Sequence, residues 1–104
     1  MAKPIQNKEE TERFIRLFKA LSNEERIEIV KLLLKNREMF AQDVERHFYL
    51  EQSTTSHHLN ILSNAGITKY RKEGRKVFYS IDYPRFLETW KLFEYMFQGF
   101  SEDV

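Results

Sequence analysis

The chain has 104 residues, of which 41% are hydrophobic and 14% aromatic, so it can form one hydrophobic core but not two. It contains no cysteine, which excludes disulfides, thiolate metal sites and cysteine-based redox sensing. The net charge is only +1, but residues 52–81 carry five basic residues against one acidic residue. The positive charge is therefore concentrated in one segment, as is typical of a surface that meets nucleic acid.

Export and membrane segments are not indicated by the sequence. The first residues lack the apolar run of a signal peptide, and apolar stretches such as Leu32-Leu33-Leu34 are far too short to span a membrane. We therefore expect a cytoplasmic protein with no membrane partner. We also expect residues 1–104 to form a single domain.

Two helices are predicted in the first third of the chain. Apolar residues recur at helical spacing over residues 8–21, namely Phe14, Leu17, Phe18 and Leu21. Ser22 followed by Glu25 matches a capping box, so a second helix is predicted to begin at that serine and to continue to about residue 35.

A helix-turn-helix is predicted at about residues 41–64. After a short link at residues 37–40, residues 41–48 form two helical turns that bury Val44 and Phe48. Residues 52–64 form the second helix, with Thr55, Leu59 and Leu62 facing inward. Gly66 is expected to end this helix in the left-handed conformation. Two short helices joined by a tight turn define the motif.

The hydrophobic period changes after this motif and predicts a β-hairpin at about residues 67–81. Its strands, 67–71 and 76–81, are rich in isoleucine, valine and aromatic residues, and a charged turn containing Gly74 separates them. The aromatic side chains of the hairpin are expected to pack inward.

A last helix is predicted over residues 83–99, because Pro84 is tolerated in a first helical turn. Its aromatic residues recur at spacings of four and three, which is typical of packed helices, and they need a partner surface. They are Phe86, Trp90, Phe93, Phe97 and Phe100. The fold class is therefore mainly α with a small β-hairpin.

The helix at residues 52–64 presents a polar, nearly uncharged face opposite its apolar side. Hydroxyls, amides and an imidazole are the groups that bond base edges in the major groove. This face consists of Gln52, Ser53, Ser56, His57 and Asn60. The alternative is an ordinary solvated face, but such faces are usually rich in lysine and glutamate, which are absent here.

The hairpin turn adds basic residues directly after this helix, where they could contact DNA phosphates. The candidates are Lys72, Arg75 and Lys76. The alternative is that these lysines only protect an edge strand against aggregation.

Metal and catalytic sites are not indicated. Asp43 and His47 have the i, i+4 spacing of two metal ligands, but no third ligand is evident nearby, and His58 is expected to be structural. No nucleophile and base, carboxylate pair or phosphate loop is present, so we expect neither an enzyme nor a cofactor.

The chain resembles the ArsR family of winged-helix repressors over nearly its whole length, and three segments carry the resemblance. Residues 20–29 (ALSNEERIEI) resemble the entry to its second helix, residues 52–62 (QSTTSHHLNIL) its recognition helix, and residues 65–67 with 71–81 its wing. The resemblance implies a winged helix-turn-helix protein that forms a homodimer. The first and last helices, 8–21 and 83–99, are then at the subunit interface. The corresponding interface residues are Phe14, Phe18, Phe86, Trp90, Phe93 and Phe97.

The resemblance also implies a repressor that leaves DNA when an inducer binds, often a metal or metalloid. Phe40 and Gln42 stand where metal-sensing members have cysteines, and the last helix contains no histidine, so neither common metal site is expected. Tyr49 replaces a frequent glycine in the turn, and Glu51 a frequent serine-type cap. A left-handed tyrosine would be strained, and the glutamate would repel phosphate.

We therefore predict a sequence-specific double-stranded DNA-binding transcriptional regulator, a repressor that binds an inverted-repeat operator as a homodimer, with any inducer or protein partner unidentified. The alternative is a protein-interaction module that retains the winged-helix fold without binding DNA.

Overall fold

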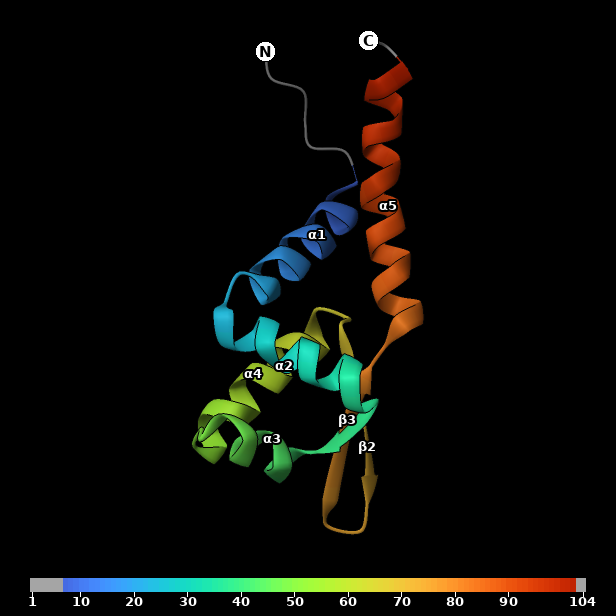
Figure 1. The fold of residues 1–104 in the computed structure, drawn as a ribbon. Helices are drawn as coiled ribbons and strands as arrows, with labels where there is room; N and C mark the ends of the chain where they lie inside the picture. Colours follow the sequence, from blue (N-terminus) through green and yellow to red (C-terminus); the bar gives the residue numbers. More distant parts are fainter. Residues whose placement is uncertain (1–6, 103–104) are drawn as a thin grey trace.

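The computed structural model describes residues 7–102, and the side chains of residues 7–98. Phe100, the last residue of the predicted aromatic stripe, therefore has a side chain outside the described residues. Within the described range the chain forms five helices and three strands (Figure 1). In order they are α1 (Lys8–Leu21), α2 (Glu24–Asn36), β1 (Glu38–Phe40), α3 (Ala41–Phe48), α4 (Gln52–Asn64), β2 (Thr68–Glu73), β3 (Lys76–Ile81) and α5 (Tyr83–Glu102).

The N-cap of the second helix lies one residue later than the capping box predicted. Asn23, not Ser22, caps α2, and its side-chain oxygen accepts a hydrogen bond from the amide of Arg26 at 3.0 Å. The Ser22 hydroxyl instead donates to the carbonyl of Lys19 and helps to end α1. Asparagine and serine are about equally good N-cap residues, so N-cap preference does not choose between these two neighbours.

The predicted link at residues 37–40 is a third strand. β1 pairs with β3, so the sheet has the antiparallel order β1-β3-β2, with Met39 opposite Tyr79. β2 and β3 form the predicted hairpin, whose two-residue turn places Gly74 at φ +62°. Glycine is preferred there because it has no Cβ to clash in the left-handed conformation.

The core lies between the helices and the base of the hairpin. It is formed by Leu17, Ala20, Ile29, Leu33, Val44, Leu59, Leu62, Ile67 and Ile81. Gly66, at φ +77°, ends α4 as predicted, and the amide of Ile67 then bonds the carbonyl of Leu62 at 3.0 Å. This turn sends the chain from the end of α4 directly into the hairpin.

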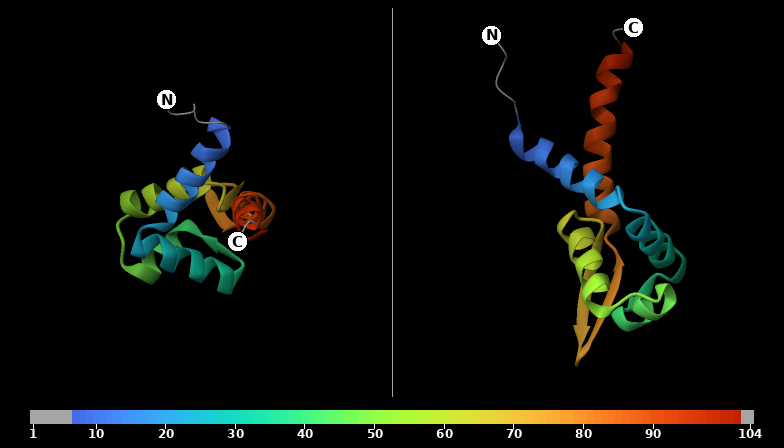
Figure 2. Two further views of the ribbon diagram at one scale, coloured as in Figure 1. Left: turned by 90° about the horizontal axis from the view of Figure 1, so that it is seen from above. Right: turned by 90° about the vertical axis from the view of Figure 1, so that its left-hand side faces the viewer.

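The last helix extends beyond the rest of the fold. Its far end projects away from α2, α3, α4 and the sheet in both side views (Figures 1 and 2), and the molecule measures 52 × 27 × 25 Å. Among the described residues, no helix combines the length and the apolar character needed to cross a bilayer.

Candidate nucleic-acid interface

Helices α3 and α4 form the predicted helix-turn-helix, joined by residues 49–51. Tyr49 ends α3 in the left-handed conformation, with φ 55° and ψ 38°. The amide of Leu50 bonds the carbonyl of Glu45 at 3.0 Å and closes the turn. Because Tyr49 is 96% exposed, its ring extends into solvent beside the start of α4.

The predicted polar face of α4 is on the surface. Gln52, Ser53, Ser56, His57 and Asn60 are all exposed, whereas Thr55, His58, Leu59 and Leu62 are buried. At about 100° per residue, the five exposed side chains cover an arc of about 140°. Hydrogen-bonding groups without charge therefore occupy the outward side of this helix.

The inward side of α4 is held partly by His58, as the sequence predicted. Arg26 Nη1 lies 3.3 Å from His58 Nδ1, and the Glu25 carboxylate lies 3.5 Å from His58 Nε2. Arg26 also donates to the carbonyls of Ala20 and Lys19. A single arginine thus connects the end of α1, the start of α2 and the buried side of the helix whose polar face is exposed.

The hairpin next to α4 is strengthened by ion pairs. Arg71 on β2 donates twice to Glu38 on β1, at 2.9 and 2.8 Å, and once to Glu73 at 2.7 Å. These hydrogen bonds hold the pKa of Glu38 below its ordinary value. Since β3 lies between the two strands, the Glu38–Arg71 pair joins the outer strands of the sheet. Arg71 is therefore committed to structure.

The remaining basic residues of the hairpin tip are exposed. Lys72, Arg75 and Lys76 all lie at the surface, and Lys76 Nζ also lies 5.6 Å from the centre of the Phe40 ring. The hairpin thus carries cations that could meet phosphate groups beside α4.

The prediction that the aromatic residues of the hairpin pack inward was wrong for two of the three. Tyr79 packs against the core, and burial raises its pKa. Tyr70 is 56% exposed, and Phe78 packs with Phe40 and under the Arg71 guanidinium. Because strand side chains alternate between faces, Phe78 and Tyr79 cannot both face the core.

Comparison with known proteins identifies this arrangement. The family model "Bacterial regulatory protein, arsR family" matches residues 23–70. An HTH-type transcriptional regulator of Methanocaldococcus jannaschii, MJ1325, is 43% identical over 84 residues, which are 81% of this chain and 94% of that protein. The chain belongs to the ArsR family.

A second relative and a solved structure extend the comparison of this ArsR-family chain. A homologue of the cadmium resistance transcriptional regulatory protein CadC from Staphylococcus aureus is 45% identical over 67 residues; the match covers 64% of this chain but only 55% of that protein. The homodimeric winged helix-turn-helix DNA-binding domain Mb0332 of Mycobacterium bovis superposes with a TM-score of 0.70 at 25% identity, covering 99% of this chain and 92% of that one.

Family membership confirms the predicted winged helix-turn-helix fold and the functional class. ArsR-family proteins are transcriptional regulators with a DNA-binding winged helix-turn-helix, and they are not enzymes. The comparisons do not favour the alternative of an interaction module that has lost DNA binding.

The aromatic residues of α5 in this ArsR-family protein gather against α1. The Phe93 ring centre lies 5.4 Å from that of Phe14 and 4.8 Å from that of Phe18. Phe86, Trp90 and Phe97 continue the cluster along α5, with neighbouring ring centres 5.0 to 6.4 Å apart. Phe14 is buried, but Phe18, Trp90 and Phe97 remain exposed, the last by 57%. The predicted interface residues therefore form one continuous aromatic cluster, in which Phe14 is buried within the subunit and Phe18, Trp90 and Phe97 are exposed.

The two candidate metal ligands, Asp43 and His47, contact neighbouring residues of α3. Asp43 forms an ion pair with Arg46 at 3.6 Å, and the His47 ring packs edge-on against Phe48. Among the described residues, no group of three histidine, cysteine or acidic side chains is placed to hold a metal ion.

The Glu38–Arg71 pair and strand β1 were missed at the sequence level. A strand of three residues carries too little alternation to be recognised, and the two paired residues are 33 positions apart. The only available signal was the acidic residue before Met39 and Phe40, which by itself does not indicate a strand.

Proposed function

We propose that a homodimer of this chain binds an inverted-repeat operator and represses transcription by occupying it. The observation that carries the proposal is the exposed, uncharged polar face of α4 beside a basic hairpin tip. A solvated helix face gains solubility from charged residues, and this face has none. Its amides, hydroxyls and imidazole match the donors and acceptors of base edges instead.

The two surfaces are proposed to have different roles. Gln52, His57 and Asn60 contact base edges in the major groove, and Ser53 and Ser56 add short hydroxyl contacts. Lys72, Arg75 and Lys76 contact phosphates, which positions the protein without selecting sequence. Glu51, at the start of α4, has no side-chain capping bond and places one negative charge near this surface.

The proposed homodimer uses the apolar surface of α1 and α5. Phe18, Trp90 and Phe97 expose aromatic area on one continuous surface, and α5 projects beyond the rest of the subunit. Covering such a surface in a subunit interface removes apolar area from water and stabilises the assembly. The Mycobacterium bovis domain of similar fold is homodimeric, which supports the same assembly here.

Repression is proposed because occupation of an operator blocks other proteins sterically and needs no further contact surface. The binding site should have two-fold symmetry, since a symmetric dimer presents two identical α4 helices.

Selection of bound fragments from genomic DNA, followed by footprinting, tests the proposal. We expect an inverted repeat with half-site centres about one helical turn, or 10–10.5 base pairs, apart. Recovery of fragments that share no sequence, or of a single unrepeated half-site, would contradict the proposed mode of binding.

A further inference from the structure

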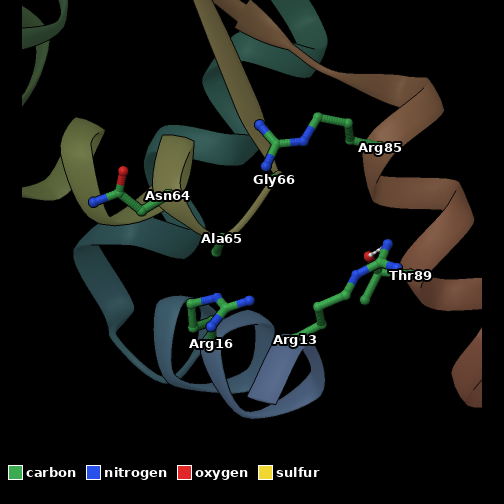
Figure 3. A pocket seen from close by; sticks show the side chains of 7 residues that line it. All are labelled: Arg13, Arg16, Asn64, Ala65, Gly66, Arg85 and Thr89. Atoms are coloured by element: carbon green, nitrogen blue, oxygen red, sulfur yellow. Dashed lines mark hydrogen bonds between the residues drawn. The ribbon is translucent and has the colours of Figure 1, made fainter. Parts of the chain in front are cut away.

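Three arginines surround a small cavity where α1, the end of α4 and the start of α5 meet (Figure 3). Arg13 and Arg16 come from α1, and Arg85 reaches from α5 toward Gly66. Asn64, Ala65 and Thr89 complete the lining. This cavity lies apart from the exposed face of α4 and the hairpin tip, and no sequence motif groups these arginines.

The cavity is strongly positive. None of its lining residues is acidic. Glu88 lies 3.6 Å from Arg13 Nη2 but is largely exposed, and the Asp82 carboxylate accepts from the backbone amide of Arg85. Within the described part of the chain, the guanidinium groups of Arg16 and Arg85 form no ion pair. At least two of the three guanidinium groups therefore have no carboxylate oxygen within 4.0 Å among the described residues.

Two of the arginines, Arg13 and Arg85, pack against neighbouring groups. Thr89 is only 5% exposed, and its hydroxyl accepts a hydrogen bond from Arg13 Nη2 at 2.8 Å. The Arg85 guanidinium lies against the backbone at Gly66, where a Cβ would stand in van der Waals contact with it, 3.4 Å from Arg85 Nε. Arg13 and Arg85 thus reach the cavity from opposite sides with part of their conformational freedom already lost.

The size of the cavity limits what it could bind. Its volume of about 40 Å³ has room for a few water-sized groups, which suits the oxygen atoms of one tetrahedral oxyanion. Guanidinium groups bind oxyanions through paired charge-assisted hydrogen bonds. We propose that Arg13, Arg16 and Arg85 form a binding site for one phosphate group.

The phosphate could belong to the DNA backbone or to a small soluble molecule, since both present the same tetrahedral group. In either case it would connect α1 and α5 to the end of α4. An occupied site would therefore couple the proposed dimer helices to the proposed base-contacting helix. This coupling rests on the proposed function, whereas phosphate binding itself does not.

Titration of the full chain with sodium phosphate, without DNA, tests the site. Thermal unfolding is followed against sodium chloride of matched ionic strength. We expect a saturable rise of the melting temperature with phosphate only. The double variant Arg16→Gln/Arg85→Gln should raise the half-saturating concentration at least about tenfold, because two charge-assisted contacts are lost. The control Lys35→Gln, which removes a cation of α2 remote from the cavity, should behave as wild type.

The source of the phosphate is decided by repeating the titration with the protein bound to a duplex. Loss of the phosphate effect identifies the DNA backbone as the occupant, and persistence of the effect identifies a soluble phosphate compound. A response to phosphate no greater than to chloride, or one that the double variant retains, would overturn the proposal. The proposal would also be overturned if phosphate left the melting temperature of the wild type unchanged and the double variant were monomeric. The arginines would then pair with carboxylates of a second subunit instead.

Discussion

Tyr49 has a left-handed backbone conformation, which is unfavourable for any residue with a Cβ. At φ 55° it costs about 1–2 kcal/mol relative to a right-handed residue, and its exposed ring gains little packing in return. Tyr49→Gly should therefore raise the free energy of unfolding by about 0.5–1 kcal/mol, after allowance for the greater chain entropy of glycine. Urea unfolding measures this directly. Tyr49→Ala, which removes the ring but keeps the Cβ, should show no gain; equal gains for both variants would place the cost in the ring instead.

Glu51 affects DNA affinity through its charge and helix stability through its missing cap. Its side chain makes no hydrogen bond to the first turn of α4. Glu51→Ser should increase affinity for every duplex severalfold, because a negative charge near phosphate is removed. Glu51→Asp keeps the charge and adds a good cap, so it should stabilise the fold by about 0.5–1 kcal/mol without the gain in affinity. Fluorescence anisotropy and urea unfolding separate the two effects, and an affinity gain with aspartate would refute the electrostatic explanation.

At the scale of elements, the Glu38–Arg71 pair should make the sheet sensitive to acid. Arg71 lowers the pKa of Glu38, so the pair contributes fully above the ordinary carboxyl pKa of 4.5 and is lost as the pH falls through the lowered value. The stability difference between wild type and Glu38→Gln should therefore be constant above about pH 5 and shrink at lower pH. NMR titration of the Glu38 carboxyl group provides the direct measurement. An unshifted or raised pKa would show that the pair is not formed in solution.

The helices could be predicted well because their signals are local. Apolar residues at helical spacing predicted α1, α3 and α4 with the bounds that the structure shows, and Gly66 predicted the end of α4. The start of α2 was misplaced because Ser22 and Asn23 are adjacent candidates for one cap. Strand β1 was missed because its pairing with β3 depends on residues about 40 positions away. Long-range pairing is not recorded in local periodicity.

The candidate DNA surface could also be predicted in part, because polar and apolar residues alternate clearly around α4. The structure exposes the five predicted side chains and buries their neighbours. The arginine cavity could not be predicted in this way. Arg13, Arg16 and Arg85 look like ordinary surface residues in the sequence, and only the crossing of α1 and α5 brings them together.

At the scale of the whole molecule, the aromatic surface should decide the oligomeric state. Trp90→Glu places a charge at the centre of this surface, where burial of a large apolar side chain contributes about 1.5–3 kcal/mol. We expect a dimer for the wild type and a monomer for this variant in analytical ultracentrifugation. Tyr95→Glu is the matched control, since Tyr95 lies about 140° around the helix from Trp90 and is largely exposed. A monomeric wild type, or a Tyr95→Glu variant that dissociates equally, would contradict the proposed interface.

In the proposed complex α4 selects the DNA sequence and the hairpin supplies affinity for any duplex. Fluorescence anisotropy on a selected operator and on a scrambled duplex, at one fixed salt concentration, tests it most directly. Gln52→Ala and His57→Ala should each lose about 1–3 kcal/mol on the operator and much less on the scrambled duplex. Arg75→Ala should weaken binding to both duplexes equally, because a phosphate contact carries no sequence information. Equal losses on both duplexes for all three variants would contradict this division of roles.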